Sequence, residues 1–164
     1  MSSWMWPTTA DVGMRVFAPS FSALLSEAAL GVQSFLMSEN AQRQINSHMR
    51  STGEWRVTSP HDPFDKNFLF LAWLDEILYR AEVHDQWLTE VVLNVQEDET
   101  GLHAIGQVSW VDAQRVEREI EIKAITTHQL TICEVAVGQT IHSEWDEVPS
   151  FDGPGWYADV IFDI

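Results

Sequence analysis

The hydrophobic repeat of the sequence changes after residue 82 from that of a helix to that of a strand. Two earlier stretches, 21–36 and 64–82, repeat their apolar residues at helical spacing. Later in the chain, apolar residues alternate with polar ones in 88–92, 102–111 and 118–137. Helices followed by a run of strands predict an α+β domain, with two helices packed on one face of a largely antiparallel β-sheet.

The two expected helices differ in how their apolar residues are arranged. In 21–36 the apolar residues form one stripe opposite a polar face, and Ser20 stands in position to cap the helix. In 64–82 they surround the helix almost completely, so we expect this helix to be the more deeply buried of the two. Asp62 and Pro63 are expected to mark its start.

Turn residues divide the strand-like part of the chain. The run 98–101, with the sequence DETG, suits a hairpin turn between two long strands, and a closing strand is predicted at 156–164. Residues 138–155 combine Gly and Pro with acidic residues and indicate a flexible acidic loop. Its acids are Glu144, Asp146, Glu147 and Asp152. Because no repeat or change of composition divides the chain, residues 1–164 are expected to form a single domain.

Acidic residues outnumber basic residues by a wide margin. The 25 Asp and Glu residues and the nine Lys and Arg residues give a formal net charge of −16, and the basic residues are scattered along the chain. Nucleic acids and anionic membranes are bound through clustered Lys and Arg, so direct high-affinity binding to either is disfavoured. An acidic surface suits a basic protein partner or a cation, while plain solubility is an equally good explanation.

The sequence also indicates in which cellular compartment the protein is expected. No run approaches the roughly 18 apolar residues of a membrane span, and the first residues lack a basic segment followed by an apolar one. The single Cys133 has no second cysteine with which to form an internal disulfide, and such a residue is commonly a small core side chain. A reducing, cytoplasmic location is therefore expected.

Carboxylates stand near both ends of the chain. Asp11 precedes a strand-like run and is followed by Gly13, which permits tight backbone geometry. Asp163 is the only acid in the apolar run 160–164, and the α-carboxylate of Ile164 stands beside it. If the fold joins these ends, three carboxylates converge and repel one another unless protons or a cation are present. Oxygen ligands favour a hard divalent ion, Ca²⁺ first, with Mg²⁺ or Mn²⁺ as alternatives, and water or a partner must complete its shell.

Five stretches give the chain a resemblance to a known family. They are TTADVG at 8–13, AALG at 28–31, WLDEILY at 73–79, EIKAITTH at 121–128 and VIFDI at 160–164. In this order and spacing they resemble the archease family, small proteins that activate the RNA-splicing ligase RtcB. The first stretch is similar to the family signature HTADVG, but Thr8 stands where the family has His.

The resemblance implies a fold and a site. It implies helices layered on a sheet, and a divalent-metal site where the chain ends meet, with Asp11, Asp163 and Ile164 as ligands. It also implies that His128 lies near this metal face, although a hydrogen-bonded sheet histidine is the alternative reading of the sequence. Thr8 would contact the metal face or the partner, but a hydroxyl neither replaces an imidazole ligand nor acts as a base near neutral pH.

Three functions are compatible with these features. The resemblance favours a non-enzymatic activator that binds RtcB, promotes its guanylylation with GTP and a divalent metal, and supports multiple turnover in tRNA splicing or RNA repair. The second is a metal-dependent hydrolase, although no base or oxyanion donor is evident beside the carboxylates. The third is a generic chaperone or adaptor that binds its partners through the acidic surface.

Overall fold

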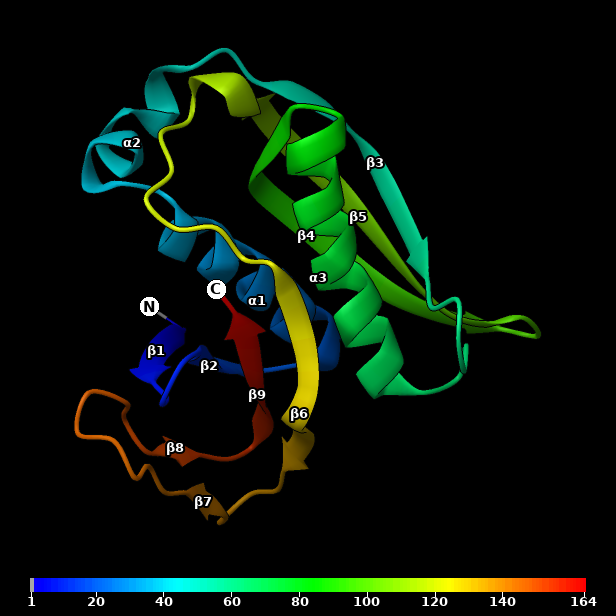
Figure 1. The fold of residues 1–164 in the computed structure, drawn as a ribbon. Coiled ribbons are helices and arrows are strands. Elements are labelled where there is room, and N and C mark those ends of the chain that lie inside the picture. Colours follow the sequence, from blue (N-terminus) through cyan, green and yellow to red (C-terminus); the bar gives the residue numbers. More distant parts are fainter. Residues whose placement is uncertain (1) are drawn as a thin grey trace.

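The strands form two antiparallel sheets that enclose the two long helices. The computed structural model describes residues 2–164, and Figure 1 shows the sheets on opposite sides of α1 (Phe21–Leu36) and α3 (Lys66–Val83). The α+β class predicted from the sequence is confirmed. The strands divide among a four-stranded sheet, a three-stranded sheet and a short two-stranded sheet, however, where a single sheet was expected.

The four-stranded sheet brings the first and last strands together. Its order is β1-β2-β9-β6, and each neighbouring pair is antiparallel. The strands span Ser3–Pro7 (β1), Val12–Ala18 (β2), Gly155–Asp163 (β9) and Ala124–Val135 (β6). Because β2 and β9 lie at its centre, residues near the two ends of the chain become hydrogen-bonded neighbours.

The three-stranded sheet contains the predicted hairpin. Its order is β3-β5-β4, with β3 at Ser51–Thr58, β5 at Gly101–Asp112 and β4 at Gln86–Asp98. Asp98 pairs with Gly101, and the Asp98 carboxylate accepts hydrogen bonds from the N–H and the hydroxyl of Thr100 at 2.8 and 2.6 Å. The turn predicted at 98–101 is confirmed.

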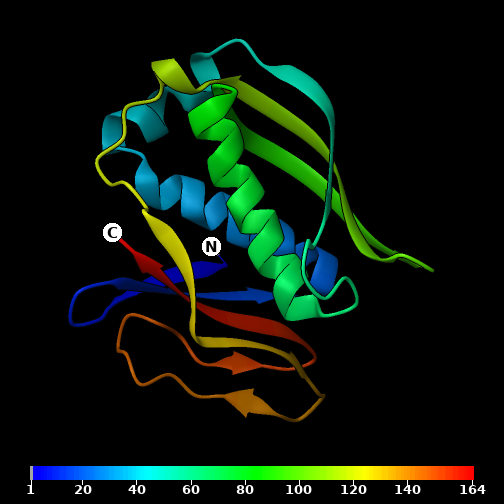
Figure 2. The same cartoon turned by 45° about the vertical axis from the view of Figure 1, so that its right-hand side comes forward.

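Each long helix contacts both sheets. α1 packs on β2 and β9 on one side and on β4 on the other, whereas α3 contacts β3, β4 and β5 together with β6. The turned view in Figure 2 shows both helices between the four-stranded sheet below and the three-stranded sheet above. Among residues 2–164, no helix is long and apolar enough to cross a membrane.

The prediction that the second long helix is the more deeply buried is wrong. Nine of the 16 residues of α1 are buried, against six of the 18 residues of α3. The reason is the position of α3 beside β3 and β6, which are edge strands of their sheets. One apolar side of α3 therefore stays at the surface, where Tyr79 and Val83 are half exposed or more.

Both long helices begin at a side-chain cap. The hydroxyl of Ser20 accepts a hydrogen bond from the N–H of Ala23 at 3.1 Å, as the sequence predicts. α3 begins at Lys66, later than expected, because the Asp65 carboxylate accepts the N–H of Asn67 at 2.7 Å. Asp62 accepts the N–H of Phe64 in the preceding turn and does not cap the helix.

The segment before β6 is not a strand, although the alternation from residue 118 predicts one. β9 ends at Asp163, which pairs with Ala124, so residues 118–123 have no neighbouring strand beyond a single bridge between Met37 and Arg118. The remaining short elements are α2 (Glu39–Gln44), the 3-10 helices η1 (Ile45–Ser47) and η2 (Ala113–Arg115), β7 (Thr140–Ile141) and β8 (Phe151–Asp152).

Trp73 joins the two long helices in the core. Its side chain is completely buried, and its indole N–H donates a hydrogen bond to the carbonyl oxygen of Leu25 in α1 at 3.0 Å. Buried indoles combine a large apolar area with one polar group that requires a partner. Trp73 satisfies both requirements at the crossing of α1 and α3.

Replacing Trp73 with alanine is expected to lower the free energy of unfolding by about 3–5 kcal/mol, because a large cavity opens between the helices. Tyr79→Ala on the same helix is the matched control, with an expected loss of less than about 1 kcal/mol because the side chain is half exposed. Urea denaturation followed by circular dichroism measures both losses. Equal losses for the two variants would contradict the assignment of Trp73 to the core.

Candidate functional site

The pairing of β2 with β9 brings Asp11 and Asp163 to the same end of the four-stranded sheet. The register runs without a bulge to the pair formed by Val12 and Phe162, so the next residues outward are the two aspartates. Side chains alternate between faces along a strand, and Met14 and Phe162 point inward to the core. Asp11 and Asp163 therefore share the outer face of the sheet, turned away from α1.

Thr8 shapes the turn that presents Asp11. Its hydroxyl accepts a hydrogen bond from the N–H of Asp11 at 3.0 Å, while its own N–H donates to the carbonyl oxygen of Asp11 at 3.2 Å. These two bonds close the turn between β1 and β2, as short polar side chains do in such turns. The structure thus gives Thr8 a positioning role at the end of the sheet.

Gly13 provides space for a tryptophan. A Cβ atom at this position would lie 2.0 Å from a ring atom of Trp6, which packs directly over the glycine from the neighbouring strand β1. The sequence analysis attributed Gly13 to tight backbone geometry. The structure instead shows that it permits close approach of the Trp6 ring on the outer face.

Lys123 is a residue of the site that the sequence analysis missed. Its N–H donates to the carbonyl oxygen of Asp163 at 2.8 Å, and its ammonium group donates to the main-chain oxygen of Ile164 at 3.2 Å. The positively charged ammonium of Lys123 therefore lies beside the last residues of β9. The stretch EIKAITTH contains one basic residue besides its histidine, and that charge next to an apolar run was the available signal.

His128 lies apart from the aspartates. Asp163 pairs with Ala124, and His128 follows four residues later along β6, roughly 13 Å away at the usual rise of a strand. It stands in a bulge between Thr126 and Thr131, next to Gln129, whose φ is 54°, and its side chain is exposed. The structure therefore places His128 away from the end of the sheet where Asp11 and Asp163 lie.

The donor set at this end of the sheet suits part of the shell of a hard cation. Asp11 and Asp163 offer carboxylate oxygens, and Ile164 offers a main-chain oxygen. Within residues 2–164, no cluster of three or more Asp, Glu, His or Cys side chains is placed to hold a metal ion. A cation bound here would complete its shell with water or with groups of another molecule.

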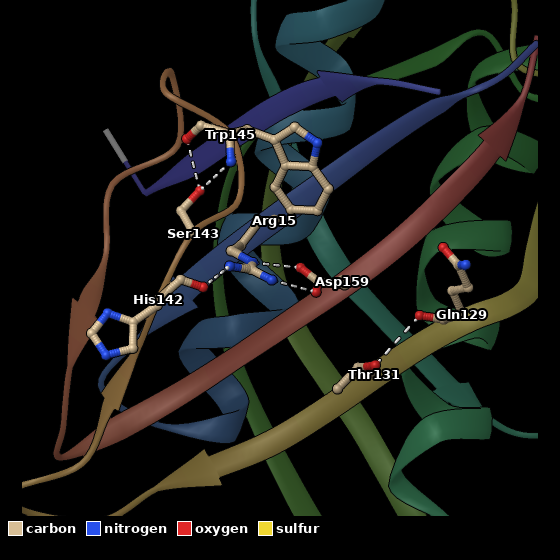
Figure 3. Close-up of polar contacts among 7 residues, drawn as sticks. All are labelled: Arg15, Gln129, Thr131, His142, Ser143, Trp145 and Asp159. Carbon is tan, nitrogen blue, oxygen red and sulfur yellow. Dashed lines mark hydrogen bonds and ion pairs between the residues drawn. The ribbon is translucent and has the colours of Figure 1, made fainter. Parts of the chain in front are cut away.

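A buried ion pair occupies the same outer face further along β2 and β9. The guanidinium of Arg15 donates two hydrogen bonds to the Asp159 carboxylate, both at 2.7 Å, and a third to the carbonyl oxygen of His142 at 3.2 Å (Figure 3). The side chains of Arg15 and Asp159 are only 9% and 16% exposed. The hydrogen bonds to Asp159 raise the pKa of Arg15 above its usual value, so the guanidinium stays charged.

The ion pair holds the acidic loop against the sheet. The ring of Trp145 stacks on Trp6 with 4.4 Å between centroids, and Arg15 lies 5.4 Å from the centroid of Trp145. Further along the loop, Phe151 stacks on Phe17 at 4.5 Å. The 138–155 segment is therefore packed over the outer face at these points, where the sequence suggested a flexible loop.

The packing of Trp145 also fixes where the acids of the loop lie. Glu144, Asp146 and Glu147 line a hollow on the protein surface together with Trp6 and Pro7 at the end of β1. Pro7 directly precedes Thr8 and the turn that leads to Asp11. The loop thus adds negative charge beside the turn that carries Asp11.

Replacing Arg15 with alanine is expected to destabilise the protein by about 3–5 kcal/mol, because Asp159 is left buried without its partner. Hydrogen exchange of the 139–148 amides should accelerate as the loop loosens. The double variant Arg15→Met/Asp159→Leu should recover most of the stability.

Arg43→Ala is the matched control for the loss of an arginine. Arg43 and its partner Glu39 have side chains that are 68% and 90% exposed, so the expected change is at most about 1 kcal/mol. Unchanged exchange of the loop in Arg15→Ala would show that the ion pair does not hold it.

Comparison with known proteins agrees with this architecture. The model of the Archease protein family (MTH1598/TM1083) matches residues 5–164. The solution structure of protein 1598 of Methanobacterium thermoautotrophicum is similar, with a TM-score of 0.67 at 19% sequence identity over 99% of each chain, which shows a shared fold. No curated protein sequence gives a significant match. Since the family model spans nearly the whole sequence, the chain belongs to the archease family.

Proposed function

We propose that this protein activates the RNA-splicing ligase RtcB, promoting its guanylylation and multiple turnover in tRNA splicing or RNA repair. Membership of the archease family supports this role. The observation that carries the proposal is the β2–β9 register, whose last pair, Val12 and Phe162, leaves Asp11 and Asp163 as the next residues at one end of the two strands. Two carboxylates with an incomplete oxygen shell suit a cation that is shared with a partner.

In this proposal, residues of this protein bind the cation and present it to the ligase. Thr8 holds the turn that aims Asp11 at the outer face, and β9 aims Asp163. A divalent ion, with Ca²⁺ preferred over Mg²⁺ or Mn²⁺, would supply the positive charge that neutralises the two carboxylates. Lys123 holds the main-chain oxygen of Ile164 and keeps the last residues against β6.

Most arginines of the protein are paired with acidic residues, which supports a role in which the ligase, and not this protein, contacts RNA. Six of the seven arginines pair with an acid of the chain. Phosphate binding requires clustered cations that are free to displace counterions. The pairs are Arg15–Asp159, Arg43–Glu39, Arg50–Glu90, Arg80–Glu76, Arg115–Asp112 and Arg118–Glu82.

We propose that the protein has no turnover of its own. The polar neighbours of the two aspartates are Thr8, whose hydroxyl accepts the N–H of Asp11, and Lys123, whose ammonium donates to Ile164. Neither residue has a neighbouring histidine to act as a general base, since His128 stands in the distant bulge of β6. The contacts of these groups support a binding role in preference to the hydrolase alternative.

Asp11→Ala and Asp163→Ala are each expected to weaken divalent-cation binding by about tenfold or more, because each removes a charged ligand. Calorimetric titration with Ca²⁺ and with Mn²⁺ measures the affinity, and circular dichroism checks the fold. Asp146→Ala in the acidic loop is the control for a general loss of negative charge. Affinities unchanged in both site variants would refute a shared site.

Adding the protein to purified RtcB from the same source is expected to accelerate guanylylation of the ligase by GTP. Asp11→Ala should remove most of the acceleration, while Asp146→Ala should retain it, because the second variant keeps the cation ligands. The protein alone should release no product from RNA, nucleotides or phosphoesters. Metal-dependent hydrolysis that disappears in Asp11→Asn would overturn the proposal in favour of an enzyme.

A further inference from the structure

A groove opens between α3 and the first half of β6, on the inner face of the four-stranded sheet. Its α3 wall includes Phe68, Leu71 and Asp75, and its β6 wall includes Ile125 and Thr127. The segment after β3 closes one end. Ile125 pairs with the buried Phe162, so its side chain points to the inner face, opposite to the face of Asp11 and Asp163.

The strand that forms one wall of the groove has a free edge. β6 stands at the end of the sheet order and pairs with β9 alone among the strands of residues 2–164. The bulge that interrupts this pairing begins after Thr126, so residues 124–126 remain in regular register with β9. A regular edge strand presents main-chain N–H and C=O groups that a further strand can pair with.

The groove carries one carboxylate on apolar walls. Asp75 belongs to the WLDEILY stretch, and among residues 2–164 it forms no ion pair or hydrogen bond through its side chain. Burial against its neighbours raises the pKa of Asp75, although part of the side chain remains open to solvent. No Lys or Arg of the described chain lines the groove, and the other titratable residue among its lining residues is His61.

We propose that β6 and α3 form a docking groove for an extended, basic segment of a partner protein, which adds to the free edge of β6 as a fifth strand. Alternate side chains of that segment would face α3. An apolar residue packs against Phe68 and Leu71, and a Lys or Arg two residues away pairs with Asp75. This inference concerns a different face from the cation site and does not depend on the proposed ligase activation.

The dimensions and charge of the groove select this occupant. Its volume is about 230 Å³, below the roughly 300–1,000 Å³ of pockets that enclose a small molecule, but sufficient for side chains of a strand that lies across it. The net charge of −16 repels an acidic segment and attracts a basic one. Main-chain pairing gives such strand addition its affinity, and the pocket residues give it specificity.

The test uses the full-length protein labelled with ¹⁵N and a seven-residue peptide, TVTKTVT, whose Val and Lys residues share one face of a strand. Titration followed by NMR should shift the amide signals of 124–127 and of 68–75. The peptide TVTETVT, with Glu for Lys, should bind at least about threefold more weakly, since it places a like charge on Asp75. N-methylation of the peptide amides that face β6 should remove binding, because it deletes the main-chain donors.

Asp75→Asn is expected to abolish the difference between the Lys and Glu peptides, with the fold unchanged because asparagine has nearly the same shape and lining the groove does not require the charge. Asp146→Asn, which removes a carboxylate of the acidic loop, should leave the difference intact. The proposal is overturned if millimolar TVTKTVT shifts no signal in 124–127, if the shifts centre on 144–147, or if N-methylation has no effect. A preference for Lys that persists in Asp75→Asn overturns the role of Asp75.

Discussion

The pairing of β2 with β9 determines the relations among the remaining parts of the protein. Its register brings Asp11 and Asp163 to one end of the two strands and pairs Arg15 with Asp159 further along. A slip by one residue would move every side chain of a strand to the opposite face. The apolar residues of both strands oppose such a slip from the inner face, and the two 2.7 Å hydrogen bonds between Arg15 and Asp159 oppose it from the outer face. The candidate cation site and the position of the acidic loop on the sheet therefore both depend on this register.

The two helices support this sheet in different ways. α1 lies between the sheets, and the carbonyl oxygen of its Leu25 accepts a hydrogen bond from the indole N–H of Trp73. The hydroxyl of Ser22 in α1 accepts a hydrogen bond from the N–H of Val95 in β4 at 3.1 Å. α3 closes the side of the molecule between two edge strands. This position explains why α3, whose apolar residues are spread around the helix, is the less buried of the two, and why a groove remains beside β6.

Local features of the fold were predictable from the sequence, whereas contacts between distant residues were not. The stripe in 21–36, the cap at Ser20 and the turn at 98–101 depend on neighbouring residues, and the structure confirms them. The start of β6 depends on where β9 ends, which no local pattern records. At the candidate site, the two aspartates were predictable from the resemblance of both ends to one family. The contacts of Lys123 and the pair formed by Arg15 and Asp159 span 41 and 144 residues, so the partners of these side chains cannot be read from neighbouring residues.

The carboxylates on the outer face of the sheet differ in whether a basic side chain of the protein pairs with them. Asp159 is largely buried and receives a guanidinium that makes two hydrogen bonds to it, so its charge is neutralised within the fold. Asp11 and Asp163 lie at one end of the same pair of strands, and within residues 2–164 neither forms an ion pair with an arginine or lysine side chain. The nearby ammonium of Lys123 is directed to the main-chain oxygen of Ile164. At this end of the sheet the negative charge is left to a cation from outside the chain, as the proposed function requires.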